Sequence, residues 1–139
     1  MNVQNQEDGF LEIPHSADLA LQVWAASLSG LFIQAAKGMY CLLRIENHEG
    51  SEVFRKMDMQ EIDFENLLVS FLNELLVDLQ LNKKVYDQFH LEINHPELIG
   101  DLTGKKISGV GREIKAVTYH NLKIAKTKSG FQTTIVFDI

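Results

Sequence analysis

The chain has 139 residues, of which 45% are hydrophobic and 23% are charged, and its formal net charge is −6. This length predicts a single domain, residues 1–139, and the single cysteine excludes an internal disulfide. The negative charge argues against direct binding to nucleic-acid phosphates. The sequence shows no secretory signal and no membrane-spanning apolar run, so we expect a cytoplasmic protein outside membranes.

The chain is predicted to begin with two strands. Residues 10–13 form a short apolar run that Pro14 interrupts, and residues 19–24 alternate with the two-residue period of a strand. The segment between these runs, which ends at Asp18, is therefore expected to be a loop or the entry to the second strand.

A helix is predicted after these strands. Apolar residues recur at three- and four-residue steps from Leu28 to Leu43, so they share one helical face. Ser27 and Ser29 are both suitable N-caps. Cys41 lies within the apolar pattern, and we interpret it as a buried structural thiol.

The second predicted helix is the clearest element of the sequence. Asp63 can cap it, and residues 64–79 carry a wide apolar stripe, while residues 52–59 before it alternate weakly as an extended segment. We expect the stripe to cover one face of a sheet; a groove for a partner is the alternative. The polar residues on its other side are Glu65, Asn66, Ser70, Asn73, Glu74 and Asp78.

The remainder of the chain is predicted to be mostly extended. Residues 89–94 alternate as a strand, whereas Gly100 and residues 103–106 indicate turns. Residues 113–125 and 131–137 are two long extended stretches joined by a hairpin connection. The resulting order, β-β-α-β-α followed by several strands, predicts the α+β class: a compact two-layer sandwich of a mostly antiparallel sheet against two amphipathic helices.

Two carboxylates occupy unusual positions. Asp18 directly precedes an apolar strand, and Asp138 ends the last one, beside the α-carboxylate of Ile139. Neighbouring anionic groups repel each other unless a cation lies between them, and hard cations such as Ca²⁺ and Mg²⁺ prefer oxygen ligands. A metal site is one interpretation; a turn residue and a solvated Asp are the alternatives.

Three further residues could support such a site. His15 lies close to Asp18, and His120 could join it if its strand runs alongside; a lone histidine is more often a surface or hydrogen-bonded residue. Lys115 could pair with a carboxylate, contact an anionic partner, or be a plain surface lysine. The sequence contains no P-loop, dinucleotide-binding fingerprint, serine-hydrolase elbow or two-cysteine zinc pattern.

Four segments resemble the archease family. Residues 10–18, Phe-Leu-Glu-Ile-Pro-His-Ser-Ala-Asp, are similar to the family's opening, in which His-Thr-Ala-Asp follows an aromatic residue, although Ser16 replaces the usual Thr. Residues 113–120, Glu-Ile-Lys-Ala-Val-Thr-Tyr-His, are close to its most recognisable stretch. Residues 67–76 resemble its second helix and residues 136–139 resemble its terminus. The segments follow the family's order over nearly the whole chain.

This resemblance implies a function and a site. Archeases are compact α/β sandwiches that bind a metal ion, and the matching positions here are Asp18, Asp138 and the terminal carboxylate of Ile139. The expected cofactor is a divalent ion of the Ca²⁺ or Mg²⁺/Mn²⁺ class. The expected partner is the RtcB-type GTP-dependent RNA ligase of tRNA splicing and RNA repair. Archeases speed formation of its guanylate intermediate and allow repeated turnover, so the chain is expected to be an activator and not an enzyme.

Two other functions stay open at this point. One is a chaperone or modulator of RNA-modifying enzymes such as a tRNA methyltransferase, a role suggested for archeases. The other is a metal-dependent hydrolase that uses Asp18 and Asp138 for the metal and His15 or His120 as the base. The sequence offers no visible nucleophile–base pair for the hydrolase.

Overall fold

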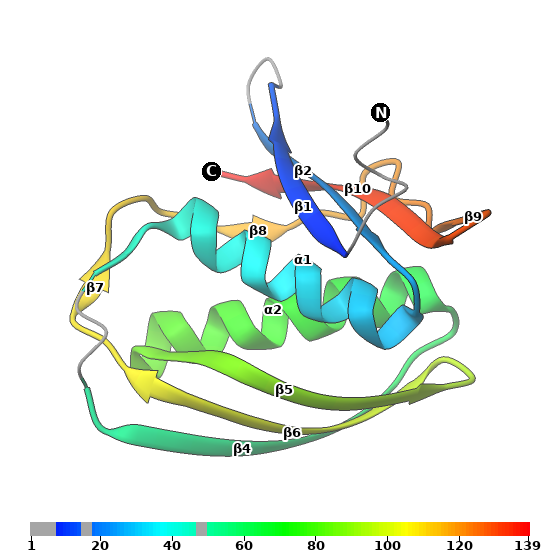
Figure 1. The fold of residues 1–139 in the computed structure, drawn as a ribbon. Coiled ribbons are helices and arrows are strands. Elements are labelled where there is room, and N and C mark those ends of the chain that lie inside the picture. Colours follow the sequence, from blue (N-terminus) through cyan, green and yellow to red (C-terminus); the bar gives the residue numbers. More distant parts are fainter. Residues whose placement is uncertain (1–7, 15–17, 47–49) are drawn as a thin grey trace.

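The computed structural model describes residues 8–14, 18–46 and 50–139, and it places two helices between two antiparallel sheets (Figure 1). The α+β class, the antiparallel pairing and the order of the main elements agree with the sequence prediction. The expected layer of sheet against the helix pair is present. A second sheet adds a layer on the opposite side, so the helices contact sheet on two sides.

Both helices begin at residues that the sequence predicts as caps. Helix α1 spans Leu28–Leu43, and the side chain of Ser27 accepts a hydrogen bond near its first turn. Helix α2 spans Phe64–Asn82, and Asp63 accepts a hydrogen bond from a backbone N–H in the same way. Each cap satisfies one of the backbone donors that a helix leaves unpaired at its start. Among the described residues, no helix is long and apolar enough to cross a membrane.

The first sheet contains the first two strands and the last three. Its strands are β1 (Gly9–Ile13), β2 (Leu19–Ala25), β8 (Ala116–Val117), β9 (Ala125–Thr127) and β10 (Gly130–Asp138). The order is β1-β2-β10-β8, and β9 pairs with the beginning of β10. The last strand therefore lies inside the sheet, between β2 and β8 (Figure 1, red arrow), and Asp138 at its end pairs with Ala116 of β8.

The second sheet comes from the middle of the chain. Its strands are β4 (Glu52–Gln60), β5 (Lys84–Asn94) and β6 (Glu97–Lys106), in the order β4-β6-β5. A short pair, β3 (Ile45–Glu46) with β7 (Gly109–Val110), joins the two halves of the fold. The inner faces of both sheets pack against the helices, so one apolar core runs through the whole chain.

The predicted turns at Gly100 and residues 103–106 are wrong, because both lie within strand β6. A Cβ atom on Gly104 would lie 1.8 Å from the carbonyl oxygen of Val85 and 2.6 Å from the Cα atom of Tyr86. The pairing of β5 with β6 changes register directly after Tyr86. Gly104 therefore permits the close approach of the neighbouring strand at a bulge, a use of glycine that a local pattern does not distinguish from a turn.

The predicted extended stretch at residues 113–125 is only partly strand. The structure assigns two short strands to it, β8 and the first residue of β9, and the rest is irregular. Several of its backbone groups bond to side chains of α2 and not to another strand. A segment held in this way needs no regular ladder to satisfy its backbone.

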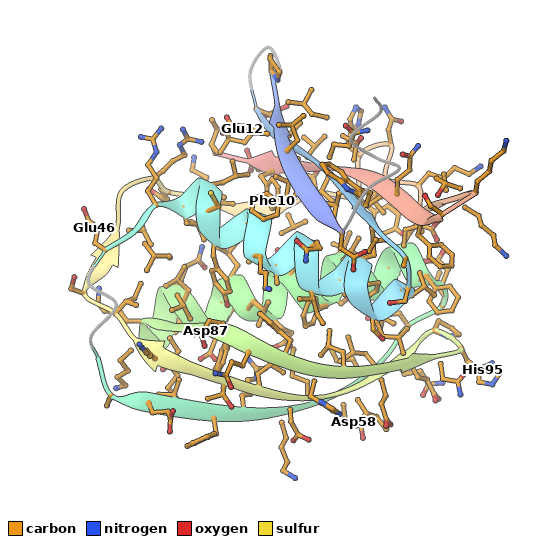
Figure 2. All side chains as sticks on the ribbon, viewed as in Figure 1. Phe10, Glu12, Glu46, Asp58, Asp87 and His95 are labelled. Atoms are coloured by element: carbon orange, nitrogen blue, oxygen red, sulfur yellow. The ribbon has the colours of Figure 1, made fainter. Side chains whose placement is uncertain are left out.

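Helix α1 is buried on more than its predicted face. Gly38 is buried, and the packing there is so close that an added Cβ atom would lie 2.4 Å from the side chain of Leu21 on β2. Figure 2 shows Phe10 of β1 projecting towards this helix as well. The prediction of a buried Cys41 is wrong: the thiol is exposed, on the same narrow stripe as exposed Lys37.

Replacing Gly104 with alanine should lower the free energy of unfolding by about 2 kcal/mol or more, because an added Cβ collides with the backbone of β5. The matched control is Gly109→Ala, since a Cβ there meets only the Glu46 carboxylate at 3.5 Å. We expect the control to change stability by less than about 0.5 kcal/mol. Urea unfolding followed by circular dichroism measures both variants. Equal stability of the two would contradict the close approach at Gly104.

Candidate metal centre

Asp138 is the last residue of β10, and the strands on either side determine its neighbours. Phe137 pairs with Leu19 of β2, and Asp138 pairs with Ala116 of β8. Asp18 directly precedes Leu19, so continuing this register by one residue would set Asp138 opposite Asp18. The fold thus brings these two carboxylate-bearing residues, 120 positions apart in the sequence, to one end of the first sheet.

The alternation of β10 determines which face carries the carboxylates. Phe137 is fully buried against the helices, so the next side chain, Asp138, points to the outer face and is exposed. Directly opposed residues on antiparallel strands have Cβ atoms about 5 Å apart, and like charges at that separation destabilise the pair. A bound cation between Asp18 and Asp138 would remove this repulsion.

The end of β10 is also held from the side of β8. The backbone N–H of Lys115 donates to the carbonyl oxygen of Asp138 at 2.8 Å. The backbone N–H and the hydroxyl of Thr118 both donate to the carbonyl oxygen of Val136 at 3.0 Å. Of the predicted supporting residues, Lys115 is therefore beside Asp138 through its backbone, and its side chain is exposed.

The structure does not bring His120 to the same place. Thr118 already lies beside Val136, two residues back from Asp138, and the chain continues away from the end of β10. His120 follows in an exposed turn. The other predicted histidine, His15, lies outside the described residues.

The candidate ligands are all oxygen atoms, which suits a hard cation, but they are too few to fill its coordination sphere. Among residues 8–14, 18–46 and 50–139, no three His, Cys, Asp or Glu side chains gather closely enough to hold a metal ion. Asp18, Asp138 and the carboxylate of Ile139 offer only oxygen ligands. Ca²⁺ takes about six to eight such ligands and Mg²⁺ about six. These residues fit such an ion if water or groups from another molecule complete its coordination.

The polar side of α2 has a role that the sequence interpretation missed. The Asn73 side chain donates to the carbonyl oxygen of Val117 at 3.2 Å and accepts from the N–H of Val117 at 3.0 Å. Gln80 donates to the carbonyl oxygen of Ile114 at 3.1 Å. A signal was present: none of the 19 residues of α2 is Lys or Arg, which is unusual for a face in water.

The start of α2 bonds to the C-terminal part of residues 113–125. Asp63 accepts hydrogen bonds from the backbone and then the side chain of Asn66, which lower its pKa, and from the hydroxyl of Tyr119 at 3.2 Å. Burial, followed by this bond to Asp63, raises the pKa of Tyr119 to about 12. Glu65 accepts from the backbone N–H of Ile124 at 3.1 Å.

Other polar residues of α2 bond to the second sheet. Arg55 of β4 contacts Glu74 at 2.7 Å and Asp78 at 3.3 Å. Burial raises the pKa of Asp78, but hydrogen bonds from Tyr86 and Asn82 and the charge of Arg55 outweigh it, so the net shift is downward. The polar residues of α2 therefore join both sheets to the helix.

One cavity of the fold can be considered as an active site. It has a volume of about 470 Å³ and lies between the C-terminal halves of both helices and residues 107–114. Its lining contains no Ser, Cys or His that could act as nucleophile or base, and its ionisable side chains are Lys83, Arg112 and Glu113. This cavity gives no support to the hydrolase interpretation.

Comparison with known sequences gives a consistent result. The pattern of the Archease protein family (MTH1598/TM1083) matches residues 10–139. The chain is 28% identical to protein archease of Methanosarcina barkeri over the full length of both chains. It is 31% identical to protein archease of Saccharolobus islandicus over 90% of this chain and 94% of that protein.

Two solved structures share the fold. The solution structure of Methanobacterium thermoautotrophicum protein 1598 has a TM-score of 0.70 at 20% identity and covers 94% of this chain and 99% of its own. The crystal structure of an archease from Thermotoga maritima, described as a possible chaperone, has a TM-score of 0.69 at 25% identity. The matched region spans 91% of this chain and 94% of the Thermotoga maritima chain.

The phenol of Tyr119 should ionise at a pH of about 12, because burial and then the hydrogen bond to the Asp63 carboxylate raise its pKa. Its raised pKa stabilises the fold fully below the ordinary value of 10, and this contribution is lost as pH rises from about 10 to about 12. Absorbance at 295 nm measures the titration. Tyr40 and Tyr86 also have pKa values raised by burial, and they should titrate later.

Two variants identify this step. Tyr119→Phe should remove the absorbance change that we assign to Tyr119. Asp63→Asn keeps a good helix cap but has no charge, so it should move the pKa of Tyr119 back towards 10. A wild-type Tyr119 that already titrates near 10 would contradict the bond to Asp63.

Proposed function

The chain belongs to the archease family, and on that basis we propose that it binds a divalent cation and activates an RtcB-type GTP-dependent RNA ligase. The activator would promote guanylylation of the ligase and its repeated turnover in tRNA splicing and RNA repair. The observation that most supports a cation site is the pairing of Phe137 with Leu19, because Asp138 and Asp18 are the next residues beyond this pair at the same end of the sheet.

Asp18, Asp138 and the carboxylate of Ile139 would hold the cation. When bound, a divalent ion supplies positive charge to nearby phosphate oxygens, and phosphoryl transfer depends strongly on such charge. The protein's own contribution is to orient the carboxylates on the outer face of the sheet, where Asp138 is exposed. That face is open to a second molecule, which could complete the coordination.

Charge favours a protein partner over direct contact with RNA. A chain with a net charge of −6 is repelled by phosphate backbones, whereas the basic surface that a ligase uses for RNA and nucleotide attracts it. We propose that the carboxylate end of the first sheet docks near the metal and nucleotide site of the ligase.

A second candidate is a chaperone or modulator of RNA-modifying enzymes such as a tRNA methyltransferase. The observation in its favour is the Thermotoga maritima relative, which is described as a possible chaperone. This function would improve the solubility or specificity of the client enzyme and would depend little on Asp18. Dependence on the carboxylates therefore separates the two candidates.

The test is multiple-turnover RNA ligation by the host's RtcB-type ligase with GTP and Mn²⁺, with and without this protein. We expect the wild-type protein to stimulate ligation and Asp18→Asn or Asp138→Asn to reduce the stimulation by about tenfold or more, as loss of metal-site residues generally does. The matched control is Asp58→Asn, because Asp58 is an exposed carboxylate on β4 of the other sheet (Figure 2).

Direct Mn²⁺ binding to the isolated variants completes this test. Full stimulation by Asp138→Asn, with its circular dichroism spectrum unchanged, would overturn the carboxylate site. A wild-type protein that leaves an active ligase unchanged would favour the chaperone function.

A further inference from the structure

Strand β8 has only two residues, and its outer edge is paired with a side chain. Both backbone groups of Val117 bond to Asn73 of α2: its N–H donates to the Asn73 Oδ1 atom at 3.0 Å, and its carbonyl oxygen accepts from Nδ2 at 3.2 Å. A carboxamide has the donor and acceptor that a backbone peptide offers. Asn73 therefore takes the place of one residue of a neighbouring strand.

The opposite edge of β8 holds the end of β10. Val117 pairs with Phe137, and Ala116 pairs with Asp138. Lys115, the next residue outward, donates its N–H to the carbonyl oxygen of Asp138 at 2.8 Å. The contacts thus run without a gap from the middle of α2, across β8, to the residue that carries the carboxylate.

The shortness of β8 makes the Asn73 contact important. A strand of two residues forms few ladder bonds of its own, so it depends on neighbours at both edges. Removing Asn73 would leave the partly buried N–H and carbonyl groups of Val117 unpaired. The least costly response is a shift of β8 that exposes these groups to water, and β8 would then no longer hold β10 in its present register.

We propose that Asn73 is a positioning residue for the candidate cation site: it fixes β8, and through β8 it fixes the main chain at Asp138. The part of this inference that concerns cation affinity rests on the proposed function. The part that concerns the backbone of β8 and β10 does not depend on it. Asn73 itself touches no proposed ligand and acts only through the strand.

The chain provides a closely matched control in the next residue. Glu74 also lies in the middle of α2 and also bonds to a neighbouring element, but that element is Arg55 of β4, on the opposite side of the helix. Glu74→Ala therefore removes a polar contact of α2 without touching β8. Any effect that Asn73→Ala shares with Glu74→Ala reflects general loss of stability.

The experiment combines backbone amide hydrogen exchange, resolved by NMR, with Mn²⁺ titration followed by the electron paramagnetic resonance signal of the free ion. In Asn73→Ala we expect faster exchange at Lys115 and Val117 relative to amides of β6, and Mn²⁺ affinity weakened by about tenfold. In Asn73→Asp, which keeps the acceptor but loses the donor, we expect a smaller loss. Glu74→Ala should leave both measurements at wild-type values.

The outcomes separate this inference from the proposed function. Unchanged exchange at Lys115 in both Asn73 variants would overturn the positioning role, as would an equal effect of Glu74→Ala. If Asn73→Ala proves too unstable to study, Asn73→Asp decides the question alone. If the wild-type protein binds no Mn²⁺, the proposed metal site fails, while exchange at Lys115 still decides whether Asn73 positions the strand.

Discussion

Helix α2 has sheet on two sides, and several of its polar side chains bond to neighbouring elements of the protein. Arg55 supplies a cation to Glu74 and Asp78 from the second sheet. Asn73 and Gln80 bond to backbone groups on the side of the first sheet. A polar group buried without a partner costs about 1–3 kcal/mol, so buried Asp78 and partly buried Asn73 require matching groups from the elements that pack against this helix.

This requirement accounts for the form of the segment that follows β7. Its backbone bonds to side chains spaced along α2, so most of it is irregular although its position is well defined. It becomes a strand only at Ala116–Val117, where it has α2 on one side and β10 on the other. That short strand gives the final residue of β10, Asp138, a neighbour at its exposed end.

Electrostatics and geometry together make this end of the sheet suitable for the proposed activity. Asp18 and Asp138, far apart in the sequence, adjoin the last pair of β2 and β10, Leu19 with Phe137, and like charges opposed at such a position would repel each other. The described side chains offer too few ligands to surround a cation completely. Under the proposed function, this incomplete shell is useful, because a group from the partner can enter it.

The sequence by itself determined both helices, the caps Ser27 and Asp63, and the alternation of the last strand, because periodicity and capping depend on residues within a few positions of each other. It indicated Asp18 and Asp138 mainly through family resemblance. The tertiary structure alone decided that the strands divide between two larger sheets and one short pair, and that Gly104 lies within a strand. It also decided that the Asn73 side chain completes the edge of strand β8. These features depend on which distant backbone lies within bonding distance, and a local sequence pattern does not contain that information.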